Sequence, residues 1–366
     1  MKLSQVIDEL VEERGLERSV LGEIVCAGIL AAYQKKYPDL SLEVVHDVKS
    51  DELVVSVKKQ VVGSIEDVDR EIGLKKARLI NRDAQVGDTV SVPFEGRVGR
   101  IEILKAKQVI AQGIRDVESA ATYECFKDKV GAILYGAVHK AENAGVTVKL
   151  NDETLAFLPK SLMIPGEQCP VGHTIKALLR EVLLEPRNEN QLILDRVSPD
   201  FVLRLFELEI PEVFEKIVEI KKIARIPGYK SKILLVSHDK NIDPVGTCIG
   251  IGGVRIKPIL RELNGEKVDV IRFGTSTEDL VADALKPAAV NRVEIDPERG
   301  ALVWLDDDQR SAAIGKAGQN IALASRLVDL SITLVAPGAN AEVSVHDESV
   351  VSDEEGASGP EGAGEL

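Results

Sequence analysis

The stretch "SAAIGKAGQNIALASRL" (residues 311–327) places two glycines, Gly315 and Gly318, three positions apart where a helix is otherwise expected. Glycine costs roughly 1 kcal/mol relative to alanine inside a helix, so two of them need a physical reason. Without Cβ atoms, the backbone can approach a ligand closely and direct its N–H groups at it. The spacing therefore predicts a turn between two helices that is open to a phosphate-bearing ligand.

The same pattern occurs 65 residues earlier, in "TCIGIGGVRI" (residues 247–256), where Gly250 and Gly253 match the later pair. Each copy follows a strand-like run ("KILLVSHD" or "ALVWLDDD") and precedes a helical segment and another strand ("VDVIRF" or "SITLVA"). A helix–GxxG–helix unit beside a three-stranded sheet is the plan of the KH domain, whose loop binds about four nucleotides of a single strand. A purely structural helix–turn–helix remains the alternative.

The residues in and beside the two loops are the candidate RNA contacts. Lys316 can reach phosphate oxygens, whereas Gln319 and Asn320 can hydrogen-bond base edges. The first loop has no charge between its glycines, so we expect it to bind phosphate less strongly, although Arg255 follows closely. The candidates are Gly250, Ile251, Gly252, Gly253, Arg255, Gly315, Lys316, Ala317, Gly318, Gln319 and Asn320.

A basic stretch, "KKIARIPGYKSK" (residues 221–232), holds five lysines and arginines and no acid. One interpretation is a positively charged surface for nucleic acid, which adds Arg225 and Lys230 to the candidate RNA contacts. The other is a solvated helix end. The stretch alone does not decide between them.

The length of 366 residues suggests two to four domains, and 44% hydrophobic with 29% charged residues is typical of a soluble globular protein. The cysteines and histidines form no zinc-ligand pattern, and no GxxxxGK[ST] motif is present. The acidic run at residues 306–308 is interpreted as a solvated turn that caps the next helix. We therefore expect no metal, no cofactor and no enzymatic activity.

The net charge of −14 is concentrated at the C-terminal end, since residues 341–366 carry eight acids and no base. This segment lacks bulky apolar periodicity, so we expect a disordered acidic tail that could compete with RNA for basic surfaces. The first residues, "MKLSQVIDELVEERG", do not form a signal peptide, and no apolar run is long enough for a membrane span. We expect a cytoplasmic protein with no membrane contact.

Residues 1–130 combine helical and strand-like patterns and end in a long connector helix, "RIEILKAKQVIAQGIRDVESAATYECFKDKV". The segment "ERSVLGEIVCAGILAAYQKKY" has helical spacing, and alternating apolar residues predict a strand pair around a polar turn, "KSDE". Residues 131–200 contain five short alternating runs, which suit a small antiparallel OB-type barrel.

These segments, in this order, resemble the bacterial NusA family of transcription termination/antitermination factors. The resemblance is strongest along residues 206–273, at "AAIGKAGQNIALASRL" and at "ILKAKQVIAQGIRD". It implies a multidomain α+β chain with five parts. These are an N-terminal α/β domain for RNA polymerase binding (1–130), an S-one-type OB-fold barrel (131–200), two tandem type II KH domains (201–275 and 276–340) and the tail (341–366).

The resemblance further implies a monomeric elongation factor that binds RNA polymerase through residues 1–130 and nascent single-stranded RNA through the barrel and KH domains. Such a factor modulates pausing and intrinsic termination and joins other Nus factors in antitermination. Two alternatives stay open: a phosphorolytic exoribonuclease, which also carries KH and OB modules, and a scaffold whose KH units bind proteins.

Overall fold

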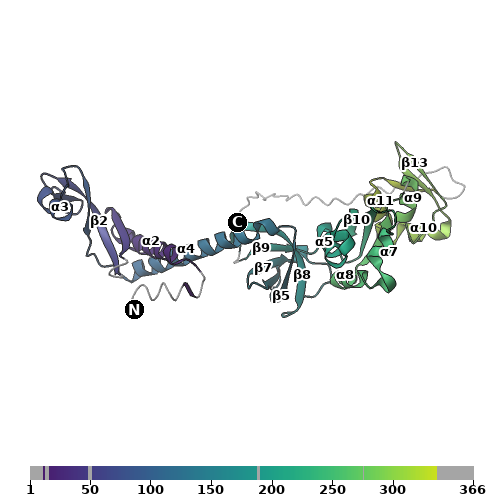
Figure 1. Cartoon of the computed structure of the whole chain (residues 1–366), viewed down its shortest axis with the longest axis horizontal. Helices are drawn as coiled ribbons and strands as arrows, with labels where there is room; N and C mark the ends of the chain where they lie inside the picture. The colour runs from purple at the N-terminus through teal and green to yellow at the C-terminus, as the bar shows by residue number, and fades with distance from the viewer. Residues whose placement is uncertain (1–10, 13–15, 48–51, 188–189, 275, 336–366) are drawn as a thin grey trace, which may run out of the picture. The chain divides into compact units, whose positions relative to one another are not determined.

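The computed structural model describes residues 11–12, 16–47, 52–187, 190–274 and 276–335 (Figure 1). The chain divides into two compact units, residues 1–130 with 181–193, and residues 131–180 with 194–366. The predicted acidic tail, 341–366, lies outside the described residues. None of the helices in the described part of the chain combines the length and apolar character needed to cross a membrane.

The first unit contains a four-stranded sheet and the two helices that the sequence predicts. β1 (Leu42–Asp47) and β4 (Thr89–Pro93) both pair antiparallel with β2 (Glu52–Val62), and β3 (Glu71–Gly73) pairs parallel with β2. The short helix α3 (Leu74–Ile80) follows β3. In β1 and β2, Leu42 lies opposite Val57 and Val44 opposite Val55, as the alternating pattern predicts.

The helices α2 (Arg18–Lys36) and α4 (Arg100–Phe126) pack closely because glycines lie at their contact. A Cβ atom on Gly28 would lie 2.3 Å from Ile110 Cγ1, and one on Gly113 would lie 2.9 Å from Ile24 Cγ2. Residues 181–193 join this unit through Ser119, whose Oγ donates to Leu184 O at 3.2 Å and whose O accepts from Gln191 Nε2 at 2.8 Å. The predicted long helix is confirmed as α4, and Ser119 ties residues 181–193 to it.

The five short runs between 131 and 200 form a closed barrel in the order β5-β6-β7-β9-β8. The strands are β5 (Ile133–Glu142), β6 (Gly145–Leu150), β7 (Leu155–Pro159), β8 (Thr174–Arg187) and β9 (Asn190–Asp195). Val146, Val148, Ala156 and Leu158 are buried, which follows from the period-two alternation of a strand. The predicted OB-type barrel is thus a closed barrel of five strands, in which β5 pairs antiparallel with β6 and β8, and β6 pairs antiparallel with β7.

Two modules of the same plan follow the barrel. The first consists of α5 (Pro199–Glu209), α6 (Pro211–Phe214), β10 (Val218–Ile226), β11 (Lys230–Ser237), α7 (Pro244–Ile249), α8 (Ile256–Glu262) and β12 (Lys267–Arg272). The second consists of α9 (Thr277–Ala284), β13 (Arg292–Asp296), β14 (Gly300–Trp304), α10 (Asp307–Ile314), α11 (Gln319–Val328) and β15 (Ile332–Val335). In each sheet the first two strands are antiparallel and the third is parallel to the second. This is the strand arrangement of the predicted type II KH domains.

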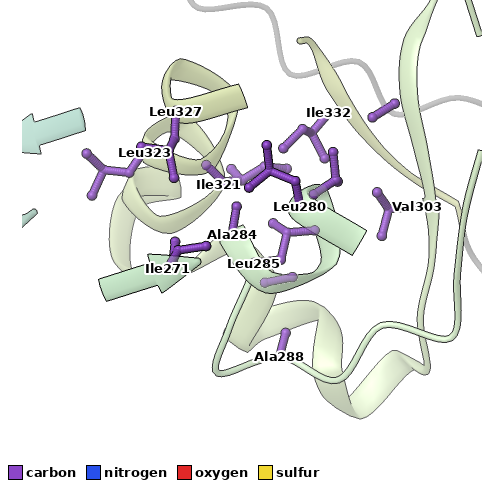
Figure 2. Packing of buried hydrophobic residues seen from close by; sticks show 14 of the residues in the cluster. Ile271, Leu280, Ala284, Leu285, Ala288, Val303, Ile321, Leu323, Leu327 and Ile332 are labelled. Atoms are coloured by element: carbon purple, nitrogen blue, oxygen red, sulfur yellow. The ribbon is translucent and has the colours of Figure 1, made fainter. Parts of the chain in front are cut away.

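The two modules share a hydrophobic core (Figure 2). Leu234 and Ile271 from the sheet of the first module belong to the same buried cluster as Leu280, Leu323 and Leu327 from helices α9 and α11 of the second. Full burial of a leucine or isoleucine side chain stabilises a fold by roughly 1.5–3 kcal/mol. Several such side chains across one boundary hold the two GxxG loops in a fixed relation.

Candidate nucleic-acid interface

Each GxxG motif forms a tight turn between two helices. In the first loop, α7 ends at Ile249, Gly250 has φ 73° and ψ 168°, and a single 3-10 turn spans Ile251–Gly253. In the second, α10 ends at Ile314, Gly315 has φ 74° and ψ 179°, and a 3-10 turn spans Lys316–Gly318. The leading glycine of each loop adopts a conformation that is essentially restricted to glycine.

The middle of each loop is exposed and its amides are unpaired. Ile251 is 96% exposed, and Gly252, Lys316 and Ala317 are also exposed. In the described part of the chain, the backbone N–H groups of these four residues donate to no protein oxygen. Two adjacent free N–H groups on an exposed turn are suited to bind a phosphate oxygen.

Lys316 and Gln319 remain available for RNA in the second loop. Lys316 is exposed, Gln319 is half-buried, and neither side chain has a partner among the described residues. Ala317 occupies the left-handed region with φ 53° and ψ 32°, where Gly252 stands in the first loop with φ 60°. The two loops therefore have the same backbone geometry but different side chains.

Asn320 does not face the ligand side as expected, because it is buried. Its Nδ2 group donates to three backbone carbonyls, those of Leu285, Ala312 and Ala313, at 3.1–3.3 Å, and its Oδ1 accepts from Lys230 Nζ at 3.2 Å. A side chain with these four hydrogen bonds cannot also reach a base edge. The prediction that Asn320 contacts RNA is therefore wrong, and its role is to connect the second loop to the first module.

Arg255 is also engaged within the protein. Its Nη1 donates to both carboxylate oxygens of Glu212, at 2.9 and 3.0 Å, and to Thr247 O at 3.0 Å. Partial burial opposes ionisation of Glu212, but its hydrogen bonds, including those from Arg255, hold the pKa of that carboxyl below its ordinary value. The charge of Arg255 is thus neutralised beside the first loop, and its side chain links Glu212 to the backbone of α7 just before that loop.

The basic stretch at 221–232 is neither an open basic surface nor a helix end, since it forms the hairpin β10–β11. Arg225 is buried against Glu266, with Nη2 and Oε2 3.0 Å apart. Lys230 and Lys232, both almost fully buried, share Oδ2 of Asp269 at 2.6 and 2.9 Å. The prediction that Arg225 and Lys230 contact RNA is wrong, because buried charges must be paired inside the protein.

Burial has a second consequence for these lysines. Loss of hydration lowers the pKa of Lys232 below its ordinary value, and the ion pair with Asp269 opposes that shift.

The Pro227–Gly228 pair between two apolar runs is the sequence signal that could have identified the β10–β11 hairpin. No comparable signal in the sequence marks which lysines are buried.

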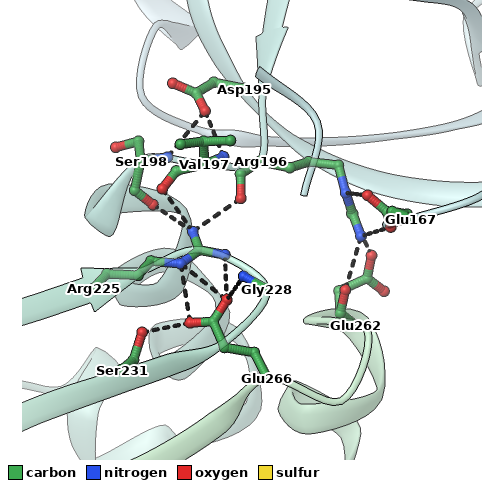
Figure 3. A network of polar contacts seen from close by, with 10 residues as sticks. All are labelled: Glu167, Asp195, Arg196, Val197, Ser198, Arg225, Gly228, Ser231, Glu262 and Glu266. Atoms are coloured by element: carbon green, nitrogen blue, oxygen red, sulfur yellow. Dashed lines mark hydrogen bonds and ion pairs between the residues drawn. The ribbon is translucent and has the colours of Figure 1, made fainter. Parts of the chain in front are cut away.

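A polar network joins the barrel to the first KH module (Figure 3). Arg196, which is 2% exposed, pairs with Glu167 at 2.5 Å and Glu262 at 2.6 Å. Arg225 Nη1 donates to the backbone carbonyls of residues 196, 197 and 198 at 2.8–3.0 Å. Glu266 also accepts from Ser231 Oγ and Gly228 N. These contacts fix the linker at residues 196–198, between the barrel and the first KH module. The sequence patterns did not predict them.

The acidic run at 306–308 lies at the start of a helix, as expected, but the Asp306 side chain makes no capping hydrogen bond to that helix. Asp306 is the N-cap residue of α10, and Asp307 and Asp308 lie in its first turn, where negative charge is favourable. Asp306 Oδ1 also accepts from Asn291 Nδ2 at 2.9 Å. Within the described residues, no group of three or more His, Cys, Asp or Glu side chains is arranged to hold a metal ion.

Two exposed GxxG loops, each between two helices and beside a three-stranded sheet, define a tandem KH protein of the RNA-binding class. Comparison with known families agrees. Residues 196–273 match the NusA-like first KH domain, residues 277–342 the NusA-like second KH domain, and residues 2–120 the NusA N-terminal domain.

Two relatives match this chain along more than nine tenths of their own length. The transcription termination/antitermination protein NusA of Thermus thermophilus is 34% identical over 360 residues, which cover 94% of this chain and 92% of that protein. NusA of Bacillus subtilis is 31% identical over 358 residues and covers 96% of each chain. The solution structure of the B. subtilis NusA N-terminal domain is 27% identical, with a TM-score of 0.25, and covers 31% of this chain and 94% of that one. The chain belongs to the NusA family and is a transcription termination/antitermination factor with KH RNA-binding domains.

Proposed function

We propose that the two GxxG loops hold nascent single-stranded RNA while the first unit docks on RNA polymerase. The observation that carries the RNA part is the pair of exposed backbone amides in the middle of each loop, which donate to no oxygen of the described residues. Because both loops belong to modules that share one core, one strand can be held at two points at a fixed separation. RNA held in this way as it leaves the polymerase would influence pausing, terminator folding and antitermination.

Double substitutions in each loop test the RNA contacts. We replace Ile251 and Gly252, or Lys316 and Ala317, by aspartate pairs in the full chain. Aspartate tolerates the left-handed backbone better than most residues, so the fold should persist. Two negative charges beside the amides should repel phosphate and weaken RNA binding by roughly tenfold or more at low salt. Wild-type RNA affinity of both double variants would refute the loop assignment.

Exposed apolar side chains in the first unit support polymerase docking. Val68, Leu79 and Val86 are 74%, 86% and 61% exposed, and Ile65 and Ile80 are also exposed. These five residues lie within one segment, residues 65–86, and exposed apolar side chains that form a patch are typical of a partner surface. Leu79→Asp should abolish co-purification with core RNA polymerase and leave RNA affinity unchanged. Removal of residues 1–130 should have the same effect on polymerase binding.

The finer assignments follow from this proposal. The chain acts in the cytoplasm as a monomer, assembles with other Nus factors in antitermination complexes, and performs no catalysis of its own. Incubation with labelled RNA and inorganic phosphate should leave the RNA intact, whereas release of nucleoside diphosphates would favour an exoribonuclease. RNA binding in a filter assay, with wild-type affinity near micromolar or tighter, would disfavour a pure protein scaffold.

A further inference from the structure

The two KH loops place their lysines differently. In the 65-residue repeat, Ile251 of the first loop matches Lys316 of the second, whereas Lys257 of the first module matches Ala322 of the second. Each module therefore has one lysine among these two positions. In the second module the lysine lies inside the loop, and in the first it lies on the helix that follows the loop.

Lys257 is close enough to the first loop to act there. It lies in the first turn of α8, and a Cβ atom built on Gly253 would be 3.7 Å from Lys257 Cε. The Lys257 side chain therefore extends back along the last residue of the loop. The other side-chain atom within 4 Å of that position is Ile256 Cγ2 at 3.9 Å, so both contacts are at ordinary van der Waals distance and there is room beside the loop.

The charge of Lys257 is available for a ligand, unlike that of its neighbour. Lys257 is exposed, and within the described residues it has no ion pair or hydrogen bond from its side chain. Arg255, two residues earlier, is paired with Glu212 and also donates to Thr247 O. An unpaired ammonium on a flexible side chain can move to a phosphate, whereas a guanidinium that is paired with a carboxylate is held in place.

We propose that Lys257 contacts an RNA phosphodiester at the first loop and replaces there the cation that Lys316 provides at the second. This inference rests on the proposed function, because it assumes that RNA passes over both loops. The sequence predicts that the first loop binds phosphate less strongly than the second. With Lys257, each loop binds phosphate with one lysine, and in the first module that lysine lies on helix α8. The apolar Ile251 then occupies the loop position that Lys316 fills in the second module.

The test is the salt dependence of RNA binding by the full chain. Lys257→Gln should weaken binding of a single-stranded RNA about five- to tenfold at about 50 mM salt. The slope of log K against log salt concentration should become shallower by about 0.7, because one fewer phosphate of the single strand is neutralised. Lys316→Gln should give a change of the same size. Lys267→Gln, at the start of β12 beyond the far end of α8 and also exposed, is the matched control and should change neither quantity.

A rescue variant makes the test specific. Adding Ile251→Lys to Lys257→Gln restores a lysine at the position that matches Lys316, and the slope should return to the wild-type value. Unchanged affinity and slope for Lys257→Gln, with a clear loss for Lys316→Gln, would overturn this inference and leave the proposed function standing. If Lys257→Gln, Lys316→Gln and the aspartate pairs all bind RNA as wild type does, the proposed function itself is wrong. Because Lys257 is exposed, a thermal unfolding curve equal to wild type should accompany each result.

Discussion

Lys230 and Asn320, 90 residues apart in the chain, are joined by a hydrogen bond in which Lys230 Nζ donates to Asn320 Oδ1 at 3.2 Å. Asn320 is the second residue after the second GxxG loop, and Lys230 begins the central strand of the first KH sheet. The same Nζ lies 2.6 Å from Asp269 Oδ2. The position of the second loop is thus fixed by the first module as well as by its own helices.

Asn320→Ala should therefore destabilise the second unit. The change leaves the buried carbonyls of Leu285, Ala312 and Ala313 without this donor, and one unpaired buried polar group costs about 1–3 kcal/mol. Urea unfolding followed by fluorescence of Trp304, the only tryptophan, measures the loss. Gln319→Ala is the matched control and should change stability by less than about 0.5 kcal/mol. Equal midpoints for Asn320→Ala and wild type would contradict the structural role.

The repeat, the glycine loops and strands β11, β12, β14 and β15 could be predicted from the sequence because their signals are local, whereas β10 and β13 were not predicted. The glycine spacing and the apolar alternation can be read within a short segment, and the repeat is found by aligning two such segments 65 residues apart. The burial of Arg225, Lys230 and Asn320 could not be predicted, because each side chain is buried against a partner far along the chain. Arg225 pairs with Glu266, 41 residues away, and charge patterning does not reveal which basic side chain will meet such a partner. Lys257 and Lys316 are exposed, and neither forms an ion pair among the described residues.

The Arg225–Glu266 pair provides a second stability prediction. Arg225→Met leaves the Glu266 carboxylate buried with only Ser231 Oγ and Gly228 N as donors, and it removes the donor of three linker carbonyls. Breaking a buried pair by removing one partner costs about 3–5 kcal/mol. The urea midpoint should fall accordingly. Arg225→Lys should recover little, because an ammonium cannot reproduce the planar fork.

A double substitution tests whether that cost comes from the orphaned charge. With Glu266→Gln added to Arg225→Met, the buried carboxylate is gone, so the double variant should be more stable than the sum of the single losses predicts. Additive losses would mean that the packing of Arg225, rather than its charge, stabilises the linker.

The two glycines of the second loop should respond differently to alanine. A Cβ atom on Gly315 would lie 2.6 Å from Asn320 Cβ and 3.0 Å from Asn320 N, whereas one on Gly318 would meet nothing within 4 Å. Gly318 has φ 73° and ψ 5°, a left-handed conformation that costs a residue with a side chain about 1–2 kcal/mol. Gly315→Ala adds a steric clash to its backbone strain, so we expect a loss of about 3 kcal/mol or more. Thermal unfolding of both variants checks the order, and equal losses would show that the loop can relax away from Asn320.

The thiol of Cys248 should make stability depend on alkaline pH. Cys248 is fully buried in α7, next to the first loop, and burial, reinforced by the negative charge of Glu212, raises the pKa of its thiol from 9.0 to about 12. Between these two values the unfolded chain releases the thiol proton while the folded chain keeps it, so the free energy of unfolding falls as the pH rises. The contribution is complete below pH 9 and declines with a limiting slope of about 1.4 kcal/mol per pH unit.

Cys248→Ala isolates this contribution, because other groups that titrate in the same range remain in both proteins. The difference in the free energy of unfolding between wild type and variant should shrink steadily from pH 9 upward. Urea titrations at several pH values measure it, with Cys125→Ala, a change at an exposed thiol, as the control that should leave the wild-type slope unchanged. Iodoacetamide at neutral pH should modify Cys125 in the folded protein and reach Cys248 only after unfolding. If the two pH profiles run parallel, or if Cys248 is alkylated in the folded chain, α7 opens beside the first loop and the buried thiol does not stabilise it.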